Sequence, residues 1–199
     1  MSTCKTRISG VATPDWTVSD GEVALRPLTP FDCGGPYLDW MNDLDSGRFL
    51  DAADRHYTSA DLAAYVQGVR DRGGFHFGIF DLRFDMHVGN VSTSLVNTRH
   101  CYAEIGIVIG SGQRERGYGS RGLGLFLDYL FGVQELHRVQ LGVSEKNTPA
   151  IKLYERLGFQ REGYCREQYL DRETGDFSGT ISYAILREEW LSDRAESET

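Results

Sequence analysis

The sequence predicts a single α/β domain in which a mixed, mostly antiparallel sheet of about seven strands is flanked by about four helices. Its 199 residues suit one domain, since a domain holds roughly 150 residues on average. Hydrophobic residues make up 40% and charged residues 25%, which is the composition of a folded globular protein. Short β-rich runs and helical patterns alternate along the chain, and this alternation indicates the α/β class.

Composition divides the chain into three parts. Residues 1–20 mix Ser, Thr, Gly and Pro with little periodicity, which predicts an N-terminal arm. Patterned segments begin at Gly21, so we expect the domain over residues 21–190 and a C-terminal tail over residues 191–199. Nothing in the arm predicts a function.

The first half of the domain predicts one strand, two helices and three further strands. Alternating side chains indicate a strand at residues 23–26, and a helical stretch follows through Met41. A second helix starts at the capping site Thr58 or Ser59 and ends near Arg72, where two glycines follow. Three β-rich runs separated by polar turns then predict an antiparallel meander: His76–Phe80, Val88–Val91 and Ala103–Ile109.

The second half predicts a helix, a strand, a helix and two strands. The first helix carries apolar residues at i, i+3, i+4, i+7 and i+8, namely Leu123, Phe126, Leu127, Leu130 and Phe131. Residues 139–143 alternate as a strand, and Asn147 caps a helix that Gly158 ends. The last two strands, 164–170 and 180–186, are joined by a turn at 173–176. The predicted order is β α α β β β α β α β β.

Charge and residue usage exclude several classes of protein. Acidic residues outnumber basic ones by 29 to 21, so a net charge of −8 repels phosphate backbones and argues against nucleic-acid binding. No apolar run approaches the ~18 residues that cross a bilayer, and no signal-peptide pattern is visible, so we expect no membrane partner. The four cysteines and five histidines are dispersed without metal-ligand spacing. We therefore expect reduced thiols in a cytoplasm, and no metal.

The most informative segment lies between the run Ala103–Ile109 and the amphipathic helix. It reads as strand, polar loop at 110–116 and helix N-terminus. Free N–H groups in a first helical turn, at the positive end of the helix dipole, suit a phosphate, and Gly117 and Gly119 allow it to approach the backbone. Three arginines add positive charge: Arg114, Arg116 and Arg121. The alternative is that both glycines only serve a tight strand-to-helix turn.

A second interpretation of this segment is dinucleotide binding. Gly117, Gly119 and Gly122 satisfy the G-x-G-x-x-G fingerprint, and Glu145 follows the next strand where a ribose-binding acid would sit. However, seven residues separate the strand from Gly117, and the 54 residues after Glu145 are too few for the further βαβ units. A dinucleotide-binding oxidoreductase therefore ranks second among the enzymes.

Two motifs resemble those of a known family. The segment Arg114–Gly119, R-E-R-G-Y-G, matches the Q/R-x-x-G-x-G/A acyl-CoA pyrophosphate loop of the GNAT superfamily of N-acetyltransferases. The segment Asn147–Phe159 resembles the N-x-x-A-x-x-L-Y-x-x-x-G-F helix of the same superfamily. The likeness extends from about Leu25 through Leu186, with one helix and one strand between the motifs, as in the family.

Shorter segments resemble one branch of this superfamily, which contains ribosomal-protein amino-terminal and amino-sugar acetyltransferases. They are Trp40–Asp43, His87–Asn90 and the closing Trp190. The sequence departs from that branch at 119–122, where Ala-Thr-Glu-Ala is usual, and at Gly179, where Asp is expected. The first departure concerns how the phosphates are held, and the second concerns the substrate.

The resemblance implies acetyl-CoA as cosubstrate. Its pantetheine would pair with the main chain of the strand Glu104–Ile109, at Ile107 and Ile109, where the neighbouring strands separate. The cofactor-binding residues implied in the loop are Arg114, Arg116, Gly117, Gly119 and Ser120. Asn147 would cap its helix and also hydrogen-bond the pantetheine arm.

The chemistry implied is attack of an amine on a thioester, which needs a base for the amine and an acid for the leaving thiolate. Glu104 would accept the ammonium proton, directly or through water; the alternative is a solvated edge-strand carboxylate. Tyr154 would protonate the sulfur, with a reference pKa of ~10 for its phenol; the alternative is a core tyrosine. Trp40, Tyr37 and Asn42 lie where two early helices would cover the acceptor, although packing is the commoner role of such aromatics.

The sequence leaves the acceptor open. An acidic protein attracts cationic acceptors, which suits an aminoglycoside, a polyamine or a protein N-terminus, and the branch resemblance also admits amino sugars. A non-enzymatic alternative is an acyl-CoA-binding regulatory module that kept the loop without the chemistry. A homodimer is a further option that the sequence does not decide.

Overall fold

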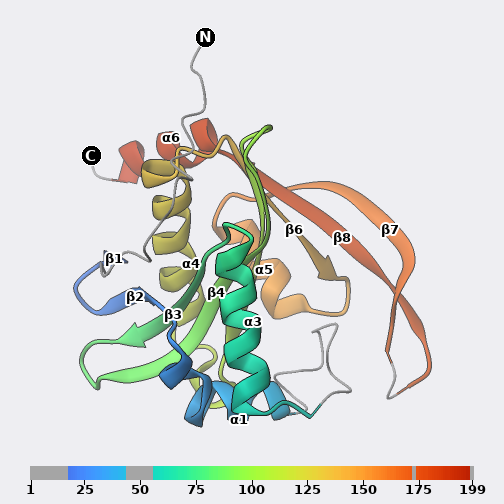
Figure 1. Cartoon of the computed structure of the whole chain (residues 1–199). Coiled ribbons are helices and arrows are strands. Elements are labelled where there is room, and N and C mark those ends of the chain that lie inside the picture. Colours follow the sequence, from blue (N-terminus) through green and yellow to red (C-terminus); the bar gives the residue numbers. More distant parts are fainter. Residues whose placement is uncertain (1–17, 44–55, 172–173, 198–199) are drawn as a thin grey trace.

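The computed structural model describes residues 18–43, 56–171 and 174–197, and an eight-stranded sheet forms its centre (Figure 1). In spatial order the strands are β1 (Val18–Ser19), β2 (Val23–Pro27), β3 (His76–Asp81), β4 (Met86–Asn97), β5 (Tyr102–Ile109), β6 (Arg138–Ser144), β8 (Phe177–Leu186) and β7 (Gln160–Leu170). Neighbouring strands are antiparallel except β5 and β6, which are parallel. The predicted mixed, mostly antiparallel sheet and the meander within it are confirmed.

Five α-helices occur in the described residues: α1 (Gly35–Asn42), α3 (Ser59–Asp71), α4 (Tyr118–Asp128), α5 (Thr148–Arg156) and α6 (Arg187–Ser197). Short 3-10 turns, η1 (Pro30–Cys33) and η2 (Ser111–Gln113), precede α1 and α4, and a π-helical turn, η3 (Tyr129–Val133), extends α4. The predicted order of elements is confirmed between β2 and β8. Part of the expected turn at 173–176 lies outside the described residues.

The two ends of the chain differ from the expectation. Two described residues of the expected arm, Val18 and Ser19, join the sheet, where they pair with Leu25 and Ala24. The expected boundary at residue 190 falls inside α6, so residues 191–197 continue a helix rather than a separate tail. The physical reason lies in Trp190, which is buried and donates its Nε1–H to Asp128 of α4 at 2.9 Å.

Helices cover both faces of the sheet. One face packs against α4, α5 and α6 and contains the larger hydrophobic cluster, to which Phe77, Phe126 and Trp190 contribute. The opposite face carries α1 and α3 over a smaller cluster around Leu28 and Trp40. In Figure 1, α4 and α3 accordingly lie on different sides of β3 and β4. The close approach of α4 needs a glycine, since a Cβ at Gly122 would stand 2.5 Å from Ile79.

The sheet opens in its middle. Strands β5 and β6 pair only where Tyr102–Glu104 faces Arg138–Gln140. Beyond that point, β5 continues to Ile109 along β4, while β6 continues to Ser144 along β8. The two strands therefore diverge, and the facing edges of both leave main-chain groups outside the ladder. This divergence positions the candidate site.

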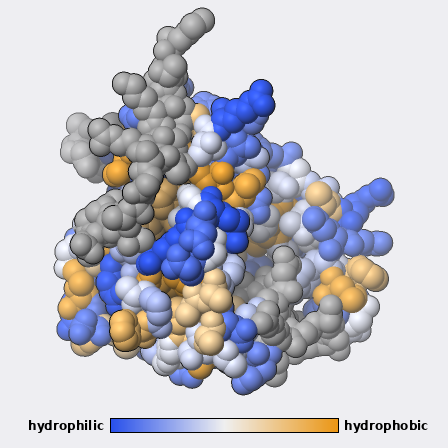
Figure 2. Space-filling view, in the orientation of Figure 1, coloured by the Kyte–Doolittle hydropathy of each residue, from blue (hydrophilic) through white to orange (hydrophobic). Residues whose placement is uncertain are grey.

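The surface and the cysteines add two findings. Figure 2 shows hydrophobic surface in separate patches bordered by hydrophilic residues, and no helix among the described residues could cross a membrane. Cys33 and Cys165 are free thiols, whereas Cys101 is disulfide-bonded. The expectation of reduced thiols throughout is therefore wrong for Cys101. That expectation rested on the wide spacing of the cysteines along the chain, and spacing in the sequence does not determine distance in space.

Candidate functional site

A loop at the open end of the divergence joins β5 to α4. Gly117 is the N-cap of α4 and has φ +82°, a left-handed conformation that glycine adopts without a Cβ penalty. No side chain caps this helix, and the Arg121 N–H donates to the Gly117 carbonyl at 3.1 Å to close its first turn. The N–H groups of the first turn are therefore available to an anion.

The loop carries less unpaired positive charge than the sequence suggested. Arg114 and Arg116 are exposed, as a phosphate-binding role requires. Arg121 instead donates to Asp20 at 2.7 Å and also pairs with Glu22, so its charge is neutralised within the protein. Although partial burial alone would raise it, the pKa of Asp20 is lowered to about 2 by the Arg121 guanidinium and two backbone N–H groups. The expectation that Arg121 adds free positive charge is wrong, because its partners lie about 100 positions away in the chain.

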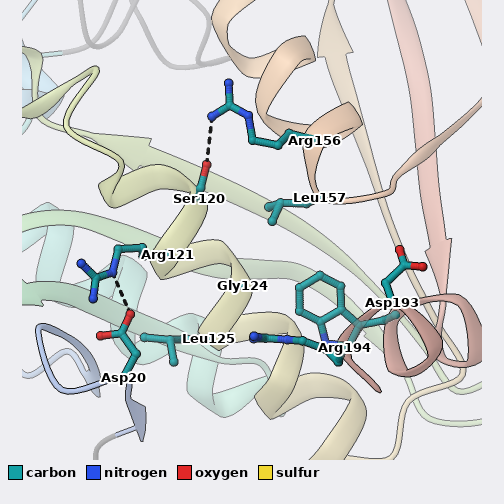
Figure 3. A pocket seen from close by; sticks show the side chains of 10 residues that line it. Asp20, Ser120, Arg121, Gly124, Leu125, Arg156, Leu157, Asp193 and Arg194 are labelled. Carbon is teal, nitrogen blue, oxygen red and sulfur yellow. Dashed lines mark hydrogen bonds and ion pairs between the residues drawn. The ribbon is translucent and has the colours of Figure 1, made fainter. Parts of the chain in front are cut away.

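A groove of about 370 Å³ lies behind the loop, between α4, α5 and α6 (Figure 3). Ser120 stands at its border, and the Arg156 guanidinium reaches across from α5 to donate to the Ser120 hydroxyl at 3.4 Å. Arg194 on the far side pairs with Asp128. Arg156, an exposed residue, therefore joins α5 to the first turn of α4.

Gly119 brings the loop and the divergence together. A Cβ built on Gly119 would stand 3.4 Å from Leu153 on α5 and 3.7 Å from Ile109 on β5. These are ordinary van der Waals distances, so an alanine would fit, whereas a larger side chain would fill the space between the end of β5 and α5. The predicted residues Ile109 and Gly119 thus border one space.

Asn147 follows β6 at the other side of the divergence. Its side-chain oxygen accepts a hydrogen bond from the Ala150 N–H at 3.3 Å, and its own N–H donates to the Ser144 carbonyl at 2.9 Å. The predicted role as the cap of α5 is confirmed. A second role toward a cofactor stays a prediction.

Tyr154 lies on the buried side of α5. It is 6% exposed, and its ring contacts those of Phe159 and Tyr183. Burial raises the pKa of Tyr154 to about 12, so the phenol keeps its proton at neutral pH. Packing and proton donation are both compatible with this position, because the hydroxyl has no hydrogen-bond partner among the described residues.

Glu104 occupies the vertex of the divergence. It is the last residue of β5 that pairs with β6, opposite Gln140, and it lies opposite Leu95 on β4. A bulge between Thr93 and Leu95 turns Ser94 toward it, and the Ser94 hydroxyl donates to Glu104 Oε1 at 3.0 Å. Sequence reasoning missed Ser94, since a one-residue bulge leaves no readable pattern.

The three residues expected over the acceptor all make contacts within the protein. Tyr37 and Trp40 are buried, and a Cβ at Gly110 would stand 2.4 Å from Trp40 Nε1, so this indole lies directly on the start of the loop. Asn42 donates to the Tyr57 carbonyl at 3.0 Å and accepts from the Tyr57 N–H at 2.8 Å. Residues 44–55 lie outside the described residues.

Glu145 does not face a ribose. Its carboxylate accepts from the Gly179 N–H at 2.6 Å and from the Tyr164 hydroxyl at 2.8 Å, and these two donors lower its pKa. A Cβ at Gly179 would stand 2.2 Å from the Tyr164 ring, which explains a glycine where Asp was expected. With its acid engaged internally and a mostly antiparallel sheet, the dinucleotide interpretation loses its structural basis.

No group of three or more His, Cys, Asp or Glu side chains in residues 18–43, 56–171 and 174–197 is arranged to hold a metal ion.

Comparison with known proteins places the fold and the motifs together. The family model of the acetyltransferase (GNAT) domain matches residues 22–160. The structure resembles spermidine N-acetyltransferase of Vibrio cholerae, solved with CoA and spermine, with a TM-score of 0.77 at 24% identity over 86% of this chain and 99% of that chain. This likeness establishes the fold.

Three curated relatives align with parts of the chain. The N-acetyltransferase p20 of Bacillus licheniformis is 28% identical over 57% of this chain and 63% of its own length. The spermidine N(1)-acetyltransferase of Vibrio cholerae is 30% identical over 64% of this chain and 72% of its own length. The ribosomal protein uS5 alanine N-acetyltransferase of Escherichia coli K12 is 28% identical over 60% of this chain and 61% of its own length. The chain thus spans between 61% and 72% of the length of these three relatives.

Proposed function

The chain belongs to the GNAT acetyltransferase family, and we propose that it transfers the acetyl group of acetyl-CoA to a primary amine. The observation that carries this proposal is the divergence of β5 and β6, with the uncapped first turn of α4 at its open end. An extended chain that ends in phosphates fits such a geometry, since a strand edge offers main-chain partners and a helix N-terminus offers anion-binding donors.

Cofactor binding follows from the residues that border the divergence. The first-turn N–H groups between Gly117 and Ser120 would bind the pyrophosphate, and Arg114 and Arg116 would add charge. The main chain of Ile107 and Ile109 would pair with the pantetheine arm, because this part of β5 has no partner in β6. Asn147 would contact the same arm from the N-terminus of α5.

The reaction is a direct attack. The nitrogen of the neutral amine forms a bond to the acetyl carbon while the carbon–sulfur bond breaks. Glu104, at the vertex, takes the amine proton, directly or through a water. Tyr154 gives a proton to the departing thiolate, and a phenol with a pKa of about 12 is protonated at neutral pH.

The acceptor class that the charge favours is a small cationic amine. A net charge of −8 attracts cations over long range, and a relative that is 30% identical acetylates spermidine. A polyamine is therefore the first acceptor to test. An amino sugar, an aminoglycoside and a protein N-terminus follow, the last because the uS5 alanine acetyltransferase is also a relative.

Release of free thiol from acetyl-CoA over a panel of amines tests the proposal. We expect saturable turnover with at least one polyamine and slower turnover with amino sugars and with peptides. CoA binding without turnover on any amine would favour the alternative of a regulatory acyl-CoA-binding module. Saturable NAD binding in competition with CoA would favour the dinucleotide interpretation.

A further inference from the structure

The first residue of α4 is tied to a buried carboxylate. Tyr118 directly follows the left-handed Gly117 and is 4% exposed. Its hydroxyl donates to Asp81 Oδ2 at 2.5 Å, and Asp81 is the fully buried last residue of β3. The two residues stand 37 positions apart in the chain, so this contact joins the cofactor loop to a distant strand.

Arg83 keeps Asp81 charged in spite of its burial. The Arg83 guanidinium donates to both carboxylate oxygens, at 3.1 and 2.8 Å, and the Arg83 N–H donates to Oδ1 at 2.8 Å. These bonds and the Tyr118 hydroxyl hold the pKa of Asp81 well below its usual range. Tyr118 therefore donates to an anion at every physiological pH, and a charge-assisted bond is roughly twice as strong as a neutral one.

A second contact fixes the same helical turn. Arg121, three residues after Tyr118, pairs with Asp20 and Glu22 in the turn between β1 and β2. Tyr118 and Arg121 thus attach the start of α4 to the end of β3 and to the turn between β1 and β2. The backbone N–H groups of Tyr118, Gly119 and Ser120 acquire a fixed direction, although no side chain caps the helix.

We propose that Tyr118 and Asp81 are positioning residues for the phosphates of acyl-CoA. They hold the first turn of α4 in the orientation that lets its N–H groups donate to the pyrophosphate, and they touch neither the thioester nor the amine. This inference rests on the proposed function, because it needs the loop to bind CoA. A positioned donor is sensitive to small displacements, since hydrogen bonds weaken steeply away from linear geometry.

The test compares two buried tyrosines on the same helical segment. Tyr118→Phe removes the hydroxyl next to the loop. Tyr129→Phe removes a hydroxyl at the opposite end of the helical segment, where the Tyr129 oxygen accepts a hydrogen bond from Gln134 at 2.7 Å. We expect Tyr118→Phe to raise the Kd of CoA and the KM of acetyl-CoA about tenfold and to change kcat by less than about twofold. Tyr129→Phe should leave all three within about twofold.

A truncated thioester separates positioning from general loss of structure. S-acetylpantetheine lacks the pyrophosphate and the adenosine, so its kcat/KM should be the same for the parent and for Tyr118→Phe. Asp81→Asn keeps the shape of the side chain and should also lose activity with acetyl-CoA but not with S-acetylpantetheine. The variant with both substitutions should bind CoA no more weakly than the single variant with the lower CoA affinity.

Three results would overturn the inference while leaving the proposed function intact. They are unchanged CoA affinity in Tyr118→Phe, an equal loss in Tyr129→Phe, and an equal loss with S-acetylpantetheine. A parent protein that binds no CoA would refute the proposed function instead, so the two failures are distinguishable.

Discussion

The two faces of the sheet are held together in different ways. On the face of α4, α5 and α6, the described residues include 26 buried side chains in one continuous cluster. On the face of α1 and α3 they include only six, and polar contacts supplement them. Arg26 and Asp32 form a bidentate ion pair there. The Asn42 side chain hydrogen-bonds both the carbonyl and the N–H of Tyr57.

This difference separates a rigid face from an adaptable one. The larger cluster contains Tyr118 and Tyr154, so a change of shape on that side would have to move a close-packed core. The smaller cluster surrounds Trp40, where less buried area opposes a rearrangement. We infer that the first face fixes the proposed cofactor site, and that the second face is where acceptor preference can change at low cost in stability.

The largest expected effect concerns Gly119, which lies on the rigid face. A valine here would project its methyl groups toward Leu153 and Ile109 and fill the space proposed for the cofactor. We expect Gly119→Val to weaken acetyl-CoA binding by about a hundredfold or more, because the close-packed surroundings do not yield. Titration calorimetry measures this affinity.

Gly112 provides the matched control, since a Cβ there meets nothing within 4 Å and its backbone is not left-handed. Gly112→Val should bind acetyl-CoA within about twofold of the parent. If Gly119→Val bound acetyl-CoA as tightly as the parent does, the proposed loop would be the wrong site.

The second effect concerns Tyr154 and separates chemistry from packing on the same face. Tyr154→Phe removes the proposed proton donor, so it should reduce kcat by about a hundredfold. Acetyl-CoA affinity should stay nearly unchanged, because the buried ring remains and the lost hydroxyl has no hydrogen-bond partner in the described residues. Tyr183→Phe is the control, because Tyr183 is a neighbouring buried tyrosine whose hydroxyl donates to Glu155 at 2.8 Å. Equal kcat values in all three proteins, measured where chemistry limits the rate, would reduce Tyr154 to a packing residue.

The sequence predicted the parts of this molecule that depend on local order. The elements from β2 to β8 have periodic side chains and local stop signals, such as Gly158 after α5, so pattern alone places them. Strand β1 has two residues and therefore no period to detect. Helix α6 depends on the contact of Trp190 with Asp128, which residue order along the helix does not reveal.

The same distinction holds within the candidate site. The loop before α4 and the Asn147 cap are predictable, because strand, loop and helix start are consecutive in the chain. The position of Glu104 at the vertex depends on where β5 and β6 stop pairing, and this register is a property of the whole sheet. The contacts of Tyr118 with Asp81 and of Arg121 with Asp20 join distant segments, so the sequence did not indicate them.

The third effect concerns Glu104, at the vertex where β5 and β6 diverge. Glu104→Gln keeps the size and the Ser94 contact of the side chain but cannot accept a proton. We expect kcat/KM to fall about tenfold near pH 6.5 and to recover partly toward pH 9.5. The recovery follows because the free amine becomes abundant as the pH approaches the reference pKa of the acceptor ammonium, ~10. Glu162→Gln, which removes a carboxylate paired with Arg138, should keep the parent profile. Parallel profiles for the parent and Glu104→Gln would instead favour a water chain as the base.

The smallest effect concerns the stability of the adaptable face and its dependence on pH. Asp32 accepts from Arg26 at 2.7 and 2.9 Å and from the Thr29 N–H and hydroxyl at 2.7 Å, and together these fasten the turn η1 that carries the buried Cys33. Burial alone would raise its pKa, but these donors lower it to about 2. A carboxyl with a lowered folded-state pKa stabilises the protein fully above its unfolded value of ~3.9, and this contribution is lost as the pH falls toward 2. Allowing for solvent screening, Asp32→Asn should lower the free energy of unfolding by about 1 kcal/mol at pH 7 and by much less near pH 2.5, in urea titrations at both values. A difference that stayed constant between the two pH values would mean that the side chain acts through its shape, and the adaptable face would then be held by packing, as the opposite face is.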